Sequence, residues 1–445
     1  MCQQGSIWSE HWKRVRLAEV LSRRVEPIDL QTETLGGLNV IAKITFGGEL
    51  VLREQDEKAD YKGALFRARP GDLIYSKIRI AQGSMTFVPD NVDHVAVSNE
   101  YPTYTIDAGR AVPGYLELVC RTQAFRGLLL SFASGNTTKM RIRPGEFENL
   151  EVPLPPLETQ RAIVARWKAA QAEIKLLEQQ AVVVEEQSRR AFEAALGLAD
   201  LPGLGDLAGL RPRVFVLWWS ESDRWSVEPN RLRKLGFQET PQSHYPSLSI
   251  STFGEVIYGL QVCPEREPRD HPTPYLRVAN VQRGYLDLTE IKQIEVAPQE
   301  LAKYRLEPGD VLLCEGNSAE LVGRGAIWQG EIEGCVHQNH VLRVRLDLQK
   351  ALPEYVLAYI NSSAGQTYFR SKAKRTTNLA SINSREVGRM PIPLPPLDVQ
   401  REIVRRVEES RAEVTRLRAQ AARRAQEARV EVEAAILGSE DLPGF

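Results

Sequence analysis

The sequence predicts an α+β protein with two tandem domains of one kind, whose sheets are curved and mostly antiparallel. The domains are separated by two long helices that pair as an antiparallel coiled coil. Three observations predict this fold class. A proline-rich segment recurs about 240 residues further along the chain, a heptad pattern follows each copy of that segment, and short apolar strands broken by turn residues make up the rest. The expected arrangement is a pseudo-twofold dumbbell.

The duplication is clearest in residues 153–164 (PLPPLETQRAIV), which return as 393–404 (PLPPLDVQREIV). Other landmarks recur in the same order. They include the turns RPGD at 69–72 and EPGD at 307–310, and the tetrapeptide DLPG at 200–203 and 441–444. This period is far longer than that of solenoid or propeller repeats, so each copy is expected to be a complete domain with an appendage.

The appendage is predicted to be a helix that begins after the prolines. Proline blocks a helix from running through it, because it lacks an N–H and fixes φ. Apolar residues then follow at alternating spacings of four and three, as in a coiled-coil seam. The predicted seam contains Ile163, Trp167, Ile174, Leu177 and Val184 in the first copy and Ile403, Val407, Val414 and Leu417 in the second. Gly197 and Gly438 are expected to end the helices, which would each span about 36 residues, or roughly 54 Å.

A helix of this length with one narrow apolar seam needs a partner, and its own duplicate is the nearest candidate. Antiparallel pairing would place the two globular copies at opposite ends. The alternative is a pair of ordinary amphipathic helices, each packed on its own domain. The predicted segments are a first domain at 1–152, a central spacer helix at 153–203, a second domain at 204–392 and a C-terminal spacer helix at 393–445.

The globular copies are expected to consist mainly of short strands with fewer helices. The clearest strands are 40–44, 73–78, 311–314 and 340–344, and the clearest helices are 113–119 and 353–359. The segment 204–246, which contains Trp218, Trp219 and Trp225, is expected to link the copies and to begin the second domain.

Composition sets few limits on function. The formal net charge is −1, so any DNA site would have to come from local clustering of basic residues. No apolar run approaches the roughly 20 residues that span a bilayer, and the first residues are unlike a signal peptide. We therefore expect a cytoplasmic location. The five cysteines are scattered without C-x-x-C pairs, which predicts free thiols in a reducing compartment.

A set of motifs occurs together in the second copy. They are 274–284 (PYLRVANVQRG), 308–310 (PGD), 337–340 (HQNH), 376–383 (TTNLASIN) and the proline-rich segment that follows. In these motifs the chain resembles the specificity (S) subunits of type I restriction-modification enzymes. The first copy repeats the scheme in a more divergent form. It lacks a counterpart of YLRVAN at 275–280, and it has VSNE at 97–100 where the second copy has HQNH.

The resemblance implies two target-recognition domains, each of which reads one half of a split sequence in double-stranded DNA. The helices would set the spacing between the halves and dock two methyltransferase (M) subunits, and motor-nuclease (R) subunits would join in the full complex. S-adenosylmethionine, ATP and magnesium are expected on those partner subunits, with no cofactor in this chain.

The sequence also lacks several catalytic motifs. There is no glycine-rich loop ending in Gly-Lys-Ser/Thr, as ATP-driven motors require, and no Asn/Asp-Pro-Pro-Tyr, which amino-methyltransferases use to hold a flipped base. Pro89-Asp90 has no following Glu-x-Lys of a nuclease. We therefore expect a targeting subunit without catalytic activity.

Candidate DNA-binding residues lie in loops that combine positive charge, amides and hydroxyl groups, because such side chains hold phosphates and read base edges. In the first domain they are Lys77, Arg79, Gln82, Asn136, Thr137, Thr138, Lys139 and Arg141. In the second domain they are Asn317, Arg324, Lys372, Lys374, Arg375, Thr376 and Asn378.

Two further hypotheses about function and one about metal binding stay open at this point. The chain could serve a different, type II-like methyltransferase-nuclease system, or it could be a coiled-coil scaffold without sequence readout. Cys335, His337 and His340 form a small group of potential metal ligands. They lie in strand-like sequence without a second ligand pair, so we expect no metal site.

Overall fold

The computed structural model describes residues 8, 11–54, 63–132, 141–198, 242–317, 321–375 and 380–438. The chain divides into two compact units, one made of residues 1–179 and 418–445 and the other of residues 180–417. The two long helices, α5 (Leu157–Ala195) and α12 (Leu397–Leu437), are each shared between the units. Each unit therefore contains one globular copy and part of both helices.

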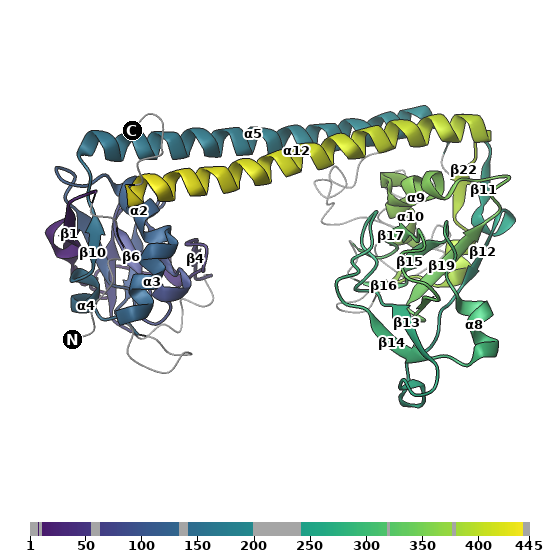
Figure 1. Ribbon diagram of the computed structural model, residues 1–445, viewed down its shortest axis with the longest axis horizontal. Coiled ribbons are helices and arrows are strands. Elements are labelled where there is room, and N and C mark those ends of the chain that lie inside the picture. Colours follow the sequence, from purple (N-terminus) through teal and green to yellow (C-terminus); the bar gives the residue numbers. More distant parts are fainter. Residues whose placement is uncertain are drawn as a thin grey trace. The chain divides into compact units, whose positions relative to one another are not determined.

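The first unit is built around a four-stranded antiparallel sheet with the order β2-β9-β6-β7. Its strands are β2 (Leu21–Arg24), β9 (Thr103–Ile106), β6 (Leu73–Tyr75) and β7 (Met85–Phe87). Helices α2 (Pro113–Arg121) and α3 (Gln123–Phe132) pack against this sheet (Figure 1). Tyr75 and Tyr104 from the strands and Tyr115 and Phe125 from the helices are all fully buried in this core.

A second sheet of the first unit has the order β4-β3-β8-β5, in which only the pair β3-β8 is parallel. Its strands are β4 (Leu50–Leu52), β3 (Asn39–Ile44), β8 (Val95–Ser98) and β5 (Leu65–Ala68). The short pair β1 (Arg14–Arg16) and β10 (Glu151–Pro153) and the helix α4 (Pro144–Glu148) complete the copy.

The second unit repeats this plan with an antiparallel sheet of the order β12-β19-β15-β17. Its strands are β12 (Gly254–Ile257), β19 (Val341–Leu346), β15 (Val311–Cys314) and β17 (Gly325–Ile327), covered by α9 (Pro353–Asn361) and α10 (Ser363–Lys372). The order of the strands along the chain is the same in both sheets. The predicted duplication of one α+β domain is therefore confirmed.

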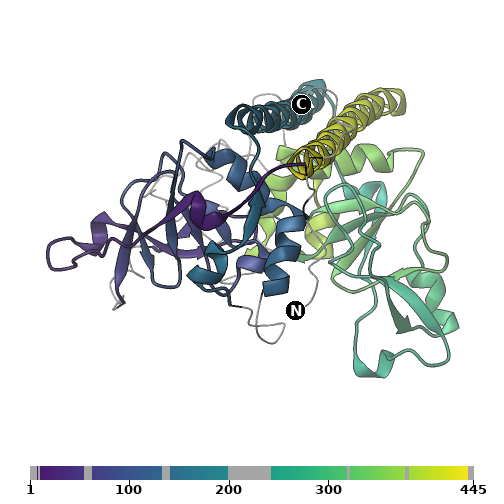
Figure 2. The same ribbon diagram turned by 60° about the vertical axis from the view of Figure 1, so that its left-hand side comes forward.

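Smaller sheets surround this core, and one of them, β14-β13-β18, forms a separate layer with α8 beside it (Figures 1 and 2). These elements are β13 (Pro272–Leu276), β14 (Lys292–Glu295), β18 (Val336–His337) and α8 (Pro298–Tyr304). The others are β16 (Gly316–Asn317), β20 (Lys374–Arg375), β21 (Ala380–Ser381), β11 (Ser247–Ser249), β22 (Pro391–Pro393) and α11 (Ser384–Gly388).

Both long helices begin and end where the sequence predicts. Each begins directly after the last proline of its segment, and Gly197 and Gly438 follow their last turns with φ of 75° and 71°. Glycine adopts this left-handed conformation without strain, so it suits the end of a helix. The pairing is antiparallel, because Glu173 lies 2.7 Å from Arg424 and Arg166 lies 3.5 Å from Glu431.

The predicted seam residues differ in burial. Ile163, Ile403, Val414 and Leu417 are buried, and Trp167, Ile174, Leu177, Val184 and Val407 are half-buried. Arg424 interrupts the apolar seam of α12, and its guanidinium is held by the carboxylate of Glu173 on α5. The seam itself and the segment boundaries drawn from the sequence stay predictions.

Some sequence expectations need correction. The strand predicted at 73–78 ends at Tyr75, because a 3-10 helix (Ile80–Gln82) follows shortly after it. Helices α3 and α10 were not expected. Most of the segment 204–246, including its three tryptophans, lies outside the described residues. The four described cysteines are free, and Cys2 lies outside. No helix in the described ranges is both long and apolar enough to cross a membrane.

Candidate nucleic-acid interface

Three chain segments meet at the end of the third strand of the main sheet in both units. In the first unit Lys77 N donates to Glu100 O at 3.1 Å, and Ile142 N donates to Lys77 O at 2.9 Å. In the second unit Glu315 N donates to His340 O at 3.0 Å, and Ile382 N donates to Glu315 O at 2.8 Å. We call this place the strand-end junction. The predicted DNA-binding tracts of both copies lead directly into it.

The strand-end junction of the first unit borders a basic hollow of about 360 Å³. The hollow is lined by the basic residues Lys43, Arg53 and Arg79, by Ser76, Ser98, Glu100 and Tyr101, and by Ile41, Ala42, Ile44 and Ile78. Arg141 lies beside it, with Nη2 2.8 Å from Glu100 Oε1. The structure thus brings the predicted residues Arg79 and Arg141 to one place and adds two cations, Lys43 and Arg53, that sequence reasoning missed.

One of the two carboxylate oxygens of Glu100 has no hydrogen-bond partner among the described residues. Its Oε1 atom accepts from Arg141, but its Oε2 atom is buried without a hydrogen-bond partner among the described residues. A carboxylate oxygen in such a position can accept a hydrogen bond from the amino group of cytosine.

Two predicted residues of the first unit, Lys77 and Gln82, do not line the basic hollow. Lys77 is buried, and its ammonium donates to the carbonyl oxygen of Asn99. Burial lowers the pKa of Lys77, whereas nearby Glu100 raises it. Lys77 therefore holds the junction together from inside the domain, and we leave it out of the proposed interface. Gln82 lines a separate groove beside α2 and α3.

In the second unit different side chains stand at the strand-end junction. Glu315 stands where the first unit has Lys77, and His340 stands where it has Glu100; Nδ1 of His340 lies 2.7 Å from Oε2 of Glu315. The two copies thus keep the same backbone contacts at the junction but present different side chains at its surface.

Three predicted residues of the second unit lie on the small sheet β16-β21-β20. Ala380 on the central strand β21 pairs with Asn317 of β16 on one side and with Arg375 of β20 on the other. Lys374 of β20 pairs with Ser381, and its side chain is exposed. Lys372, at the end of α10, places its ammonium 5.9 Å from the centre of the Tyr368 ring.

Arg324 is a predicted residue that the structure places in the interior. Its side chain is buried, and Nη2 donates to the carbonyl oxygen of Val278 at 3.1 Å. A guanidinium engaged in this way supports the domain from within, so we also leave Arg324 out of the interface. Six predicted residues lie outside the described ranges: Asn136, Thr137, Thr138, Lys139, Thr376 and Asn378.

The potential metal ligands of the second unit are occupied by other contacts. His337 is buried with Nδ1 2.6 Å from the Val341 carbonyl oxygen, His340 pairs with Glu315, and Cys335 Sγ lies 3.5 Å from the Val336 carbonyl oxygen. In the part of the chain that the structure describes, no three His, Cys, Asp or Glu side chains are placed to hold a metal ion.

No protein-family model matches the chain. Among curated proteins, the specificity subunit of the type I restriction enzyme EcoKI from Escherichia coli K12 is 26% identical over 298 residues, which cover 66% of this chain and 58% of that protein. The putative type I restriction enzyme MjaX specificity subunit of Methanocaldococcus jannaschii is 35% identical over 133 residues, which cover 30% of this chain and 31% of that protein. The chain is therefore similar to type I specificity subunits. The match to the EcoKI specificity subunit spans little more than half of that protein's length.

The fold of the chain is also found in a solved structure. A chain from a study of complex assembly and conformational transition in a type I restriction-modification system aligns with 98% of this chain and 99% of its own length, at a TM-score of 0.58 and 19% identity. The similarity in fold therefore extends over both copies and both long helices.

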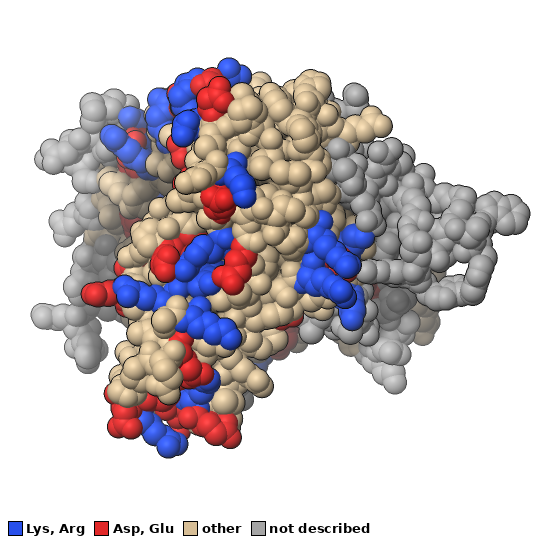
Figure 3. Space-filling model, turned by 90° about the vertical axis from the view of Figure 1, so that its right-hand side faces the viewer, with Lys and Arg blue, Asp and Glu red and all other residues tan. Residues whose placement is uncertain are grey.

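Charged side chains of both signs lie on the face of the molecule that Figure 3 shows. On the face shown in Figure 3, Lys and Arg side chains are interspersed with Asp and Glu, apart from one basic group beside the grey atoms. This agrees with the formal net charge of −1. Binding of DNA by such a chain would depend on local clusters such as the basic hollow.

Proposed function

We propose that the chain recognises a bipartite sequence in double-stranded DNA, as the specificity subunit of a type I restriction-modification complex. The observation that carries the proposal is the pair of matching sheets, β2-β9-β6-β7 and β12-β19-β15-β17, each with a chemically different strand-end junction. Two copies of one scaffold with different surface residues suit the reading of two different half-sites. The similarity to specificity subunits supports the same role.

In the first unit, the basic hollow is the proposed contact region. Lys43, Arg53, Arg79 and Arg141 supply the positive charge that draws a DNA backbone towards it. Glu100 Oε2 supplies an acceptor for a base edge. In the second unit, the corresponding region includes Asn317, Lys374 and Arg375 on the small sheet.

The proposal assigns catalysis to partners. The chain would act as a targeting subunit without catalytic activity, with two methyltransferase subunits docked on it and motor-nuclease subunits added in the full complex. S-adenosylmethionine, ATP and magnesium would belong to those partners. The complex would work in the cytoplasm, where the host DNA is.

The test is to map methylated bases across the genome of cells that express this chain with its methyltransferase partner. We expect a split motif with an unspecified spacer. The Glu100→Gln variant should change the preferred base in one half of the motif only, because the amide also offers a donor where the carboxylate only accepts. An undivided motif would contradict the two-domain proposal, and an unchanged motif in the variant would exclude Glu100 as a reading residue.

A further inference from the structure

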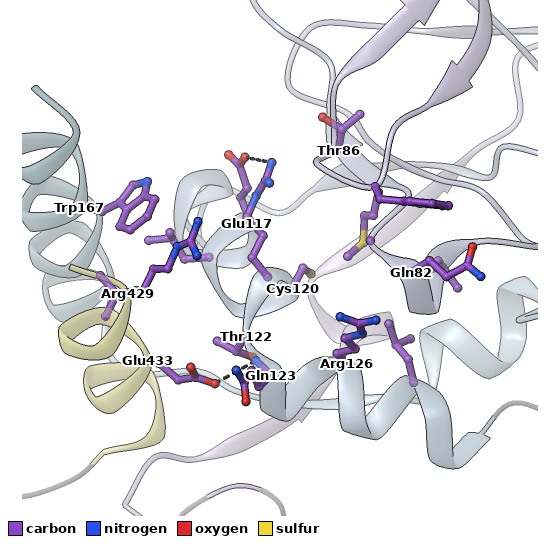
Figure 4. Close-up of a pocket in the computed structure, with 18 of the residues that line it drawn as sticks. Gln82, Thr86, Glu117, Cys120, Thr122, Gln123, Arg126, Trp167, Arg429 and Glu433 are labelled. Atoms are coloured by element: carbon purple, nitrogen blue, oxygen red, sulfur yellow. Dashed lines mark hydrogen bonds and ion pairs between the residues drawn. The ribbon is translucent and has the colours of Figure 1, made fainter. Parts of the chain in front are cut away.

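The first unit contains a groove of about 560 Å³ that the proposed DNA contacts do not use. Helices α2 and α3, strand β7 and parts of α5 and α12 form its walls (Figure 4). We call it the helix groove. The residues that matter for its chemistry are Phe46, Phe87, Arg126, Trp167, Arg429 and Glu433.

The same place can be identified in the second unit from one conserved contact. Glu433 Oε1 accepts a hydrogen bond from the backbone N–H of Gln123 at 2.9 Å, at the start of α3. Glu193 Oε1 likewise accepts from the backbone N–H of Ser363 at 3.2 Å, at the start of α10. The two glutamates, and the two residues that donate to them, are related by the same offset of about 240 residues as the sequence repeat.

The second unit fills this place with contacts among its own side chains. Arg189, the counterpart of Arg429, pairs with Glu186 at 2.5 Å and with Glu193 at 2.9 Å, and donates to Ser363 Oγ at 2.7 Å. Gln366, the counterpart of Arg126, accepts from Arg283 at 3.0 Å. The Arg283 side chain comes from the long loop between β13 and β14.

The first unit lacks two of these groups, the counterparts of Glu186 and of the loop that carries Arg283. Gln426 stands where the second unit has Glu186, and residues 45–49 form a short turn between β3 and β4 instead of a long loop. The guanidinium groups of Arg126 and Arg429 make no ion pair or hydrogen bond with any residue that the structure describes. Arg429 therefore makes neither of the carboxylate pairs that its counterpart Arg189 makes, and Arg126 adds a second exposed cation where the second unit has the neutral Gln366.

We propose that the helix groove docks an acidic peptide segment of a partner protein, in which apolar side chains flank the carboxylates. A carboxylate binds an arginine fork through two parallel hydrogen bonds, and such bonds strengthen where water is partly excluded. The groove also has apolar walls: Phe46 is 59% exposed and Val430 is 58% exposed, and Trp167 lies near Arg429 (Figure 4). Arginine also holds DNA phosphates, but the exposed Phe46 and Val430 side chains offer apolar contacts that a phosphate backbone cannot use, so an acidic, apolar peptide fits better. This inference does not depend on the proposed DNA recognition.

The test uses a phage-displayed library of random dodecapeptides, selected against the full chain and counter-selected against the double variant Arg126→Gln/Arg429→Gln. We expect enriched peptides with two or more Asp or Glu residues next to aromatic or aliphatic residues. Enrichment of peptides without acidic residues, or no enrichment over the double variant, would overturn the proposal.

An enriched peptide is then labelled and its binding measured by fluorescence anisotropy. Each single variant should weaken binding about tenfold, as expected for the loss of one charge-assisted pair. The matched control is Arg423→Gln, on the same helix, whose residue is 81% exposed and pairs with Glu427; it should bind like wild type. Equal loss in all three variants would indicate a general charge effect, and displacement of the peptide by a random duplex would indicate a nucleic-acid site. Either result contradicts the proposal.

Discussion

Gln160 and Gln400 make the same three hydrogen bonds in the two copies. Oε1 accepts from the backbone N–H of Val112 at 2.8 Å in one copy and of Leu352 at 2.9 Å in the other. Nε2 donates to two carbonyl oxygens, those of Pro155 and Arg110 in the first copy and those of Pro395 and Lys350 in the second. Both side chains are fully buried. Each glutamine joins the first turn of a long helix to the residue that precedes α2 or α9.

Replacing either glutamine should destabilise its unit. Gln160→Ala or Gln400→Ala leaves one N–H and two carbonyl groups without their partners, so we expect a loss of about 2 to 4 kcal/mol. Urea unfolding followed by circular dichroism measures the change. Gln179→Ala is the control, because Gln179 is exposed on α5. Equal midpoints for the variants and the control would refute the proposed role of the three hydrogen bonds.

A buried ion pair stabilises the second unit. Asp310 is 1% exposed and accepts from Arg345 through both oxygens at 2.8 Å, and it also accepts from Glu307 N at 2.7 Å. Asp310→Asn removes the buried carboxylate and leaves Arg345 paired only with the exposed Glu307 at 2.8 Å, so we expect a loss of about 3 kcal/mol. Glu427→Gln, which breaks an exposed pair on α12, should cost less than about 1 kcal/mol. Thermal unfolding of both variants compares the two pairs, and equal shifts would contradict the expectation.

His337 should make stability depend on pH in the acid range. Burial lowers its pKa to about 4 in the folded chain, whereas an unfolded histidine titrates near 6.5. Between these values the unfolded state binds a proton that the folded state does not, so stability falls as the pH drops from about 6.5 towards 4. The loss specific to this residue should approach about 3 kcal/mol at pH 4.

The measurement is urea unfolding at several pH values, for wild type and His337→Asn. Asparagine can keep a donor towards the carbonyl oxygen of Val341 but does not titrate. The wild type should lose more stability than the variant between pH 6.5 and 4. Parallel profiles would show that His337 is not the group responsible.

The basic hollow should contribute to the salt dependence of DNA binding. Lys43→Gln and Arg79→Gln should each reduce the slope of log K against log salt by about one unit, because each removes one phosphate contact. The assay is filter binding of a duplex that contains the methylated motif, with the methyltransferase partner present. Arg423→Gln should leave the slope unchanged. Arg375→Ala extends the measurement to the second unit, and an unchanged slope there would argue against a phosphate contact.

The long helices and the main strands could be predicted because their signals are local. Prolines before each helix, a glycine after it and a heptad pattern define α5 and α12 within a few residues. Helices α3 and α10 were missed although a local signal exists. Thr122 Oγ1 accepts from Phe125 N at 3.1 Å, and Ser362 Oγ accepts from Gly365 N at 3.4 Å. Both are N-cap residues directly after a preceding helix, which masks the start of the next one.

The candidate interface could be predicted only in part. Arg79 and Arg141 stand out as basic residues in loops. Lys43, by contrast, lies in β3, and Arg53 follows β4, so these two residues reach the hollow only once that sheet forms. The interior positions of Lys77 and Arg324 also depend on distant neighbours, Asn99 and Val278. No pattern along the chain contains this information.

The first unit is completed by the last helix of the chain. Val432, Ala435 and Ile436 belong to the same core as Trp8 and Val15, and the indole of Trp12 donates to the Ala435 carbonyl oxygen at 3.0 Å. The second unit is contiguous, from residue 180 to residue 417. We therefore expect the half that is synthesised first to complete its core only after α12 has been made, whereas the second half can complete its core from residues 180–417 alone.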